Sequence, residues 1–155
     1  MRIDYDAVLL DLFGTLVDDA GRAIDGAQTL LDRLAAARWA IVTSCPRSLA
    51  HRLLERAGLR FPPHLICADD VVAGKPAPDG YLLAAERLGV RPERCLVVED
   101  SGTGIAAGRA AAMDVVAVFT GRHPSFARAA TFALDAICDL NLEACGTGVV
   151  LVLDA

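Results

Sequence analysis

Six polar residues follow or flank short apolar runs, and their side chains are of the types that phosphoryl transfer requires. They are Asp11, Thr43, Ser44, Lys75, Glu99 and Asp100. A carboxylate such as Asp11 can act as a nucleophile, and the adjacent pair Glu99 and Asp100 can hold a divalent cation. A hydroxyl can donate to a phosphoryl oxygen, and the Lys75 ammonium can neutralise developing charge. The set therefore predicts phosphoryl-transfer chemistry.

The apolar runs beside these residues are typical of strands that are buried on both faces of a sheet. Four runs have this character, and a shorter fifth lies between the second and the third: 7–12, 40–43, 95–98 and 115–118, with 64–67 as the short one. The carboxyl ends of parallel strands meet at one edge of an open sheet, so we expect the polar residues to gather there.

The segments between the runs have helical spacing of apolar residues. The residues that indicate the helices are Leu30, Leu31 and Leu34 after a cap at Asp25, Leu49, Leu53 and Leu54 before a stop at Gly58, Leu82, Leu83 and Leu88 after a cap at Asp79, and Ile105, Ala106, Arg109 and Met113. Alternating strands and helices predict an α/β fold, a Rossmann-like three-layer α/β/α sandwich with a mainly parallel sheet. We expect residues 1–155 to form one domain, with an added edge strand at 149–153 after a turn at 146–148.

Composition excludes several classes of protein. The chain has 155 residues, of which 54% are hydrophobic, and this content excludes an intrinsically disordered chain. Its formal net charge of -5 argues against a nucleic-acid partner. With no apolar run long enough to span a membrane and no targeting segment at the start, we expect a cytoplasmic protein without a membrane partner. The five scattered cysteines are expected to be reduced thiols.

The order of the polar residues resembles the motifs of the haloacid dehalogenase superfamily. Residues 11–18 (DLFGTLVD) resemble the first motif, and Thr43 at the end of a strand resembles the second. Lys75, within GKPAP, resembles the third, and Glu99 with Asp100 before SGTGIAAG resembles the fourth. The resemblance covers the chain from about residue 5 to residue 140, and it is closest to the sugar-phosphatase and phosphoglycolate-phosphatase-like members.

The resemblance implies a role for each matching residue. Asp11 would attack phosphorus and form an aspartyl-phosphate, Thr43 would hydrogen-bond the transferring phosphoryl group, and Lys75 would pair with Asp11 and that group. Mg²⁺ would be held by Asp11, the backbone carbonyl of Phe13 and Asp100. Glu99 would reach the ion directly or through water.

The residue two positions after Asp11 departs from the family pattern. Phosphatases of the family have a second aspartate there, which acts as the general acid and base, whereas this chain has Phe13. General acid-base catalysis typically contributes about 10²- to 10⁴-fold in rate, so we expect slow hydrolysis of alkyl phosphates. Two alternatives stay open: a catalytically silent binding or regulatory protein, and a dehalogenase. The acidic pair Glu99 and Asp100 speaks against the dehalogenase, since that reaction uses no metal.

A second departure is the lack of an inserted cap domain. Only a short polar loop, 19–24, separates Asp18 from Asp25, and the segment from Thr43 to Lys75 has room for one helix and one short strand. We therefore expect a capless site that is open to solvent. The substrate is expected to be a phosphorylated small molecule or a larger phosphoester, and a homo-oligomer could cover the site.

Other polar residues are assigned ordinary structural roles. Asp18, Asp69 and Asp70 are expected to be turn or cap residues, and Arg47 to be a surface arginine that could also touch an anionic substrate. His51, His64 and His123 lack the spacing of metal ligands.

Overall fold

A six-stranded sheet forms the centre of the computed structural model, which describes residues 1–119 and 124–153. The strand order is β4-β3-β2-β5-β6-β7, and every pairing between these strands is parallel. The strands are β2 (Ala7–Leu10), β3 (Trp39–Val42), β4 (His64–Ile66), β5 (Cys95–Glu99), β6 (Asp114–Val118) and β7 (Phe132–Leu134). The predicted α/β fold with a mainly parallel sheet is confirmed.

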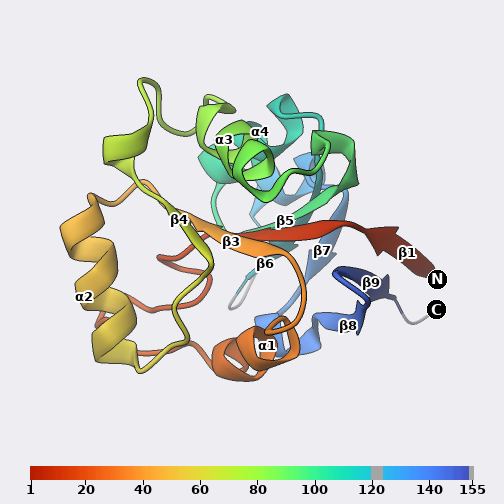
Figure 1. Cartoon of the computed structure of the whole chain (residues 1–155), viewed down its shortest axis with the longest axis horizontal. Helices are drawn as coiled ribbons and strands as arrows, with labels where there is room; N and C mark the ends of the chain where they lie inside the picture. Colours follow the sequence, from red (N-terminus) through yellow and green to blue (C-terminus); the bar gives the residue numbers. More distant parts are fainter. Residues whose placement is uncertain (120–123, 154–155) are drawn as a thin grey trace.

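Helices cover both faces of this sheet, as Figure 1 shows. On one face lie α1 (Ala27–Arg33) and α2 (Arg47–Ala57), and on the other lie α3 (Asp79–Leu88) and α4 (Gly102–Ala110). Side chains alternate along each strand, so Leu10 packs toward α1 while its neighbour Leu9 packs toward α3. The predicted three-layer sandwich is therefore confirmed.

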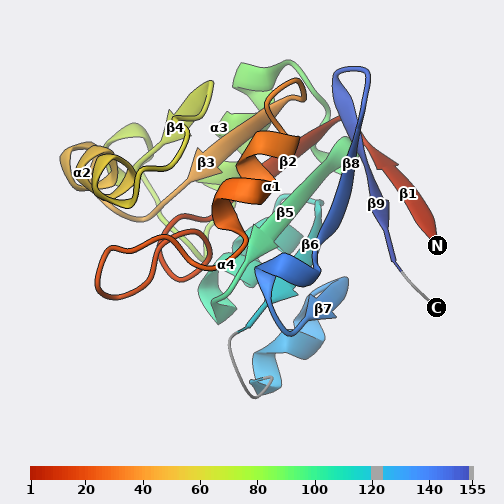
Figure 2. The ribbon, with the colours of Figure 1, turned by 90° about the horizontal axis from the view of Figure 1, so that it is seen from below.

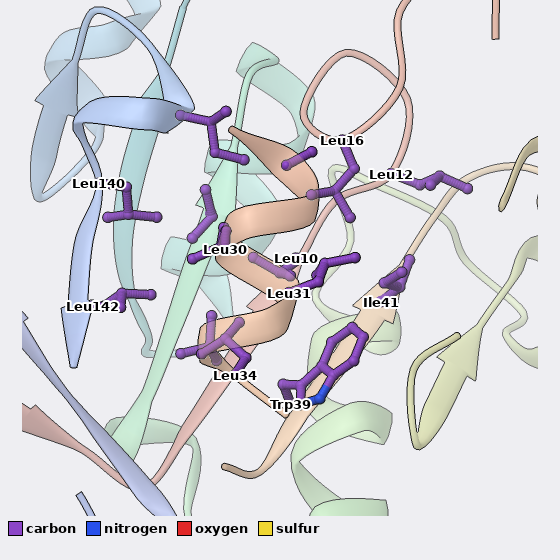
Figure 3. Close-up of a cluster of buried hydrophobic side chains, with 14 of the residues drawn as sticks. Leu10, Leu12, Leu16, Leu30, Leu31, Leu34, Trp39, Ile41, Leu140 and Leu142 are labelled. Carbon is purple, nitrogen blue, oxygen red and sulfur yellow. The ribbon is translucent and has the colours of Figure 1, made fainter. Parts of the chain in front are cut away.

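The core on the α1 face is built largely from leucines. Figure 3 shows the leucines of α1 beside the apolar side chains of the sheet strands and of the segment before and within β8 (Asn141–Cys145). The labelled members are Leu10, Leu12, Leu16, Leu30, Leu31, Leu34, Trp39, Ile41, Leu140 and Leu142. This packing fixes the strands on the α1 face of the sheet. Leu10 and Leu12 belong to it, so it also fixes the chain on both sides of Asp11.

The C-terminal apolar run does not extend the main sheet, so the prediction of an edge strand at 149–153 was wrong in its placement. It forms β9 (Gly148–Val152), the middle strand of a separate antiparallel sheet in the order β1-β9-β8. Its partners are β1 (Arg2–Tyr5) and β8, and neither strand was predicted. Figure 2 shows this small sheet beside the main one. A hairpin turn at residues 146–147 and the N-terminal strand together give β9 two partners, which an edge position in the main sheet could not supply.

Two helix starts differ from the prediction by one residue. Helix α1 begins after Gly26, whose φ of 85° is in the left-handed region, and not after a cap at Asp25. Helix α3 follows Pro78, so Asp79 lies in its first turn and not at the cap. An acidic side chain in the first turn is still favourable for the helix dipole.

In two helices, α2 and α3, the leucine spacing assigned to the buried face a residue that is exposed in the structure. Leu49 and Leu82 are exposed, at 36% and 40%, although both were assigned to the apolar face. Helix α3 instead packs on the sheet through Tyr81, Ala84 and Ala85. Small alanines let the helix approach the strands closely, and Tyr81 then reaches the carboxyl edge of the sheet.

Short 3₁₀ helices complete the described chain: η1 (Ala68–Asp70), η2 (Pro92–Arg94), η3 (Ser125–Ala129) and η4 (Ile137–Asp139). All five cysteines are free thiols, with Cys67 and Cys95 buried and Cys138 and Cys145 exposed. No described helix combines the length and the apolar character that crossing a bilayer requires.

Candidate functional site

The predicted site residues lie at the carboxyl edge of the main sheet. Asp11 follows β2, Thr43 follows β3, and Glu99 is the last residue of β5 with Asp100 directly after it. Lys75 lies in the loop between η1 and α3. Asp11, Thr43 and Glu99 are all buried. Three parallel strands that end together thus bring residues 88 positions apart in the chain into one cluster.

Lys75 joins two of the carboxylates. Its Nζ donates to Asp11 Oδ1 at 2.7 Å and to Glu99 Oε1 at 2.5 Å. The third donation goes to the Val42 carbonyl at 3.0 Å, at the end of β3. The three protons of the ammonium each have a protein acceptor, so Lys75 is fixed at the centre of the cluster.

Glu99 is held on both of its oxygens, and its side chain is 0% exposed. In addition to Lys75, the Tyr81 hydroxyl donates to Oε1 at 2.7 Å. Oε2 accepts from the backbone amide of Asp100 at 3.1 Å and from the Ser101 hydroxyl at 3.3 Å. Helix α4 approaches so closely that a Cβ on Gly104 would overlap the Glu99 carboxylate. The glycine at this position is therefore required by the buried carboxylate.

Thr15 connects Asp11 with Asp100. The Thr15 hydroxyl is buried and donates to Asp11 Oδ2 at 3.2 Å, and it lies 3.5 Å from Asp100 Oδ1. Gly14, with a φ of 85°, packs against Asp100, and a Cβ there would overlap that carboxylate. The turn at residues 13–17 thus keeps the two aspartates close to each other.

The cluster carries more negative than positive charge. Asp11, Glu99 and Asp100 are three carboxylates, while Lys75 supplies one positive charge. Burial raises the pKa of Asp11 to about 6, although Lys75 opposes this shift. Burial likewise raises the pKa of Glu99 and of Asp100. Burial alone lowers the pKa of Lys75, but the charges of Asp11 and Glu99 outweigh it, so its pKa is raised. A further cation would relieve this excess of negative charge.

The carboxylates fit a divalent metal ion. Asp11, Glu99 and Asp100 each offer an oxygen, and these three oxygens lie within 4.8 Å of one another. Oxygen ligands of this kind suit Mg²⁺, which demands compact hard donors. Phe13 is 43% exposed, in contrast to Leu12 directly before it and Thr15 two residues after it, which are both buried. An aromatic ring supplies neither a metal ligand nor a proton.

Thr43 and Lys75 both line a cavity of about 280 Å³. Ser44, Val71 and Ala77 also line this cavity. The Thr43 hydroxyl accepts a hydrogen bond from the backbone amide of Cys45 at 3.2 Å, which orients the side chain. The cavity is lined by both polar residues, such as Thr43 and Lys75, and apolar residues, such as Val71.

Residues assigned structural roles have such roles in the structure. Asp18 accepts from the backbone amides of Ala20 and Arg22, each at 2.9 Å, as a turn residue does. Asp69 accepts from the first amide of α2, at Arg47, at 2.9 Å.

Arg47, His51 and His64 lie outside the cluster. The Arg47 side chain pairs with Asp70 at 2.5 Å. His51 packs against Phe61, and His64 begins β4. His123 lies outside the described residues.

Two residues of the site were not predicted from the sequence. Thr15 was quoted as part of the first motif without a role, although it follows Asp11 by four residues within a turn. Tyr81 received no predicted role, because an aromatic residue within the helical pattern of α3 suggests ordinary core packing. A buried tyrosine hydroxyl needs a hydrogen-bond acceptor, and a carboxylate at the end of a buried strand needs donors. These two requirements are the signal that could have paired Tyr81 with Glu99.

Comparison with known families and proteins gives matches over most of the chain. A family of hydrolases described as haloacid dehalogenase-like hydrolase matches residues 17–112, more than half of the chain. Hexitol phosphatase A of Escherichia coli is 45% identical over 98 residues, which are 62% of this chain and 45% of that protein. Fructose-1-phosphate phosphatase YqaB of E. coli is 46% identical over 80 residues, 51% of this chain and 43% of that protein. The chain spans less than half the length of these two relatives.

A solved structure resembles the chain more completely. The crystal structure of a hydrolase of the same family from Deinococcus radiodurans, with bound phosphate and sodium, has a TM-score of 0.77 and 27% identity, and the match covers 86% of this chain and 92% of that one. An L-2-haloacid dehalogenase from Xanthobacter autotrophicus has a TM-score of 0.76 at 19% identity, covering 87% and 96% of the two chains. At that identity the second likeness concerns the fold alone.

Proposed function

The chain belongs to the haloacid dehalogenase-like hydrolases, and from that premise we propose that it is a Mg²⁺-dependent phosphohydrolase that acts through an aspartyl-phosphate on Asp11. The observation that supports this most is the buried Asp11 carboxylate, held by Lys75 at 2.7 Å and flanked by two further carboxylates. A structural aspartate would not need a lysine and two acidic neighbours at the end of a buried strand.

The proposed reaction has two displacement steps. In the first, an Asp11 oxygen attacks phosphorus, the bond from phosphorus to the leaving oxygen breaks, and that oxygen departs with the electron pair. In the second, water attacks the phosphorus of the aspartyl-phosphate, which restores the carboxylate and gives inorganic phosphate. Lys75 and the Thr43 hydroxyl would neutralise and orient the transferring oxygens.

Asp11, Asp100 and the Phe13 carbonyl are the groups we assign to the metal ion. When bound, Mg²⁺ would draw negative charge from the phosphoryl oxygens. Glu99 already accepts from Lys75, Tyr81 and the loop amides, so we assign it to the support of the site and to contact with the ion through water.

Phe13 is expected to set the leaving groups that the site accepts. A phenyl ring cannot protonate an alkoxide, and Asp18, the next carboxylate along the loop, is held ionised by the amides of its own turn, which lower its pKa. Alkyl phosphates should therefore react slowly, while aryl and acyl phosphates, whose leaving groups need no proton, should react faster.

Phosphorylated small molecules are the proposed substrates. The two relatives are named as phosphatases of a hexitol and of fructose-1-phosphate, a small phosphorylated sugar. In this chain residues 11–26 between β2 and α1 form a loop without a helix, and α2 and β4 fill most of the segment between Thr43 and Lys75, so the described residues place no cap over the site. We propose a single core domain whose open site also admits a larger phosphoester or a second copy of the chain.

Phosphate release from an aryl phosphate and an alkyl phosphate, with and without Mg²⁺, tests this proposal. We expect Mg²⁺-dependent release from the aryl phosphate and a gain of about 10²-fold or more on the alkyl phosphate in Phe13→Asp. If neither the unaltered chain nor Phe13→Asp releases phosphate, the chain is a silent binding protein of this family. Release of halide from a 2-haloacid without any metal would instead favour the dehalogenase alternative.

A further inference from the structure

Tyr81 is buried beside the site, and the proposed reaction gives its hydroxyl no task in phosphoryl transfer. It belongs to the first turns of α3, its side chain is fully buried, and it packs in the core on that face of the sheet. A buried phenol must place its hydroxyl on an acceptor, and Tyr81 places it on Glu99 Oε1 at 2.7 Å.

The Glu99 oxygen bound by Tyr81 is also the oxygen bound by Lys75. Lys75 Nζ lies 2.5 Å from Glu99 Oε1, and it lies 5.2 Å from the centre of the Tyr81 ring. Tyr81 therefore meets Lys75 in two ways: its hydroxyl shares an acceptor with the ammonium, and its ring lies within cation–π range of it.

All three donors of Lys75 are occupied by Asp11, Glu99 and the Val42 carbonyl. To contact a phosphoryl oxygen, Lys75 must therefore turn one N–H away from a protein acceptor. If the Glu99 contact is released, Tyr81 still donates to Oε1, so that buried oxygen is not left without a partner. Without the Tyr81 hydroxyl, Glu99 would hold Lys75 more tightly.

We propose that Tyr81 is a positioning residue, which shares Glu99 Oε1 with Lys75 and so frees the ammonium to bind the phosphoryl group. The inference rests on the proposed function, since it assigns a task to Lys75 in phosphoryl transfer. Tyr81 itself would touch neither substrate nor metal.

Tyr5, on β1 of the small antiparallel sheet, offers a matched control at the amino end of the main-sheet strands. It is also buried, and its hydroxyl donates to Asp114 Oδ2 at 2.8 Å. Tyr81→Phe and Tyr5→Phe therefore each remove one buried hydroxyl from a carboxylate and keep the ring. Tyr81→Leu removes the ring face from Lys75 as well.

The experiment measures kcat and KM for an aryl phosphate with Mg²⁺ and, separately, the Kd of inorganic phosphate. In Tyr81→Phe we expect the Kd of phosphate and KM to rise and kcat/KM to fall by about 10-fold, with Tyr5→Phe within about 2-fold of the unaltered chain. Tyr81→Leu should lose more than Tyr81→Phe. In a double-mutant cycle, Tyr81→Phe should add little to Glu99→Gln, because both act on one contact.

Two results for Tyr81→Phe would overturn the inference while the proposed function stands. If Tyr81→Phe keeps kcat/KM and phosphate affinity while both tyrosine variants lose similar stability, the Tyr81 hydroxyl only satisfies the core. Full additivity with Glu99→Gln would mean that Tyr81 does not act through Glu99. If the unaltered chain neither turns over nor binds phosphate, the proposed function fails first and this inference falls with it. Turnover with an unchanged Tyr81→Phe overturns this inference alone.

Discussion

The carboxyl ends and the amino ends of the main-sheet strands both carry acidic and basic residues, but they differ in burial and in the balance of charge. At the carboxyl edge, Asp11, Lys75 and Glu99 form ion pairs whose side chains are at most 9% exposed. At the amino edge, Arg94 pairs with Asp6 at 3.1 Å, and these side chains are 36% and 45% exposed. Solvent screens the exposed pair, so it contributes little, whereas the buried charges interact strongly and in unequal numbers. We propose that this unbalanced buried charge marks the end of the sheet where the chemistry takes place.

Removal of the proposed nucleophile, Asp11, should have the largest effect on activity. Asp11→Asn should lower phosphate release by about 10⁴-fold or more, since the amide cannot form the acyl-phosphate. Asp6→Asn makes the same chemical change at the amino edge and should leave the rate unchanged. Initial rates with an aryl phosphate and Mg²⁺ check both variants. Equal losses in the two would show that the edges do not differ in function.

Removal of Lys75 should lower the free energy of unfolding more than removal of Arg94 at the amino ends of the strands. Lys75→Met leaves two buried carboxylates without their partner, which should cost about 3–5 kcal/mol in the free energy of unfolding. Arg94→Met removes the exposed pair and should leave the free energy of unfolding nearly unchanged, because solvent screens that pair. Urea denaturation without divalent cations measures both. A Lys75→Met variant as stable as Arg94→Met would contradict the account of the buried cluster.

Crowding at the carboxyl edge is tested by Gly104→Ala. The added Cβ would overlap Glu99, and the strain should cost about 1–3 kcal/mol even though alanine favours the helix. Gly74→Ala is the matched control, because a Cβ there meets no atom within 4 Å. Thermal or urea unfolding gives the difference. A stabilised Gly104→Ala would mean that Glu99 is free to move away.

The pH dependence of stability should also reflect the buried edge. The pKa of Asp11 is raised from 3.8 to about 6, so between these values the folded chain binds more protons than the unfolded chain. The free energy of unfolding should therefore fall as the pH rises through this window. Without divalent cations, Asp11→Asn should show a shallower fall. An identical slope in Asp11→Asn would remove Asp11 as a source of the effect.

The sequence was sufficient for five of the six strands of the main sheet, all except β7, and for most of the cluster, because both depend on local patterns. Continuous apolar runs marked the central strands, and the polar residue after each run pointed to Asp11, Thr43 and Glu99. Parallel strands must end at one edge, so their convergence followed from the fold class. Gly58 was also predicted to end a helix, and it ends α2 in the left-handed conformation.

The parts that the sequence did not predict depend on contacts between distant segments. Strand β1 pairs with β9 across nearly the whole chain, and neither strand signals its partner locally. The buried position of Tyr81 depends on how closely the alanines of α3 approach the sheet. Thr15 required the geometry of the turn after Asp11, because its hydroxyl could equally have capped a neighbouring amide.

Covalent phosphorylation of Asp11 is the central claim, and intact-mass analysis tests it directly. The protein is mixed with acetyl phosphate and Mg²⁺ and quenched in acid. Its intact mass is then measured by mass spectrometry beside that of Asp11→Asn treated in the same way. We predict a mass increase of one phosphoryl group in the unaltered chain, located on Asp11, and none in the variant. Phosphate release without any phosphorylated protein, or equal labelling of Asp11→Asn, would contradict the account.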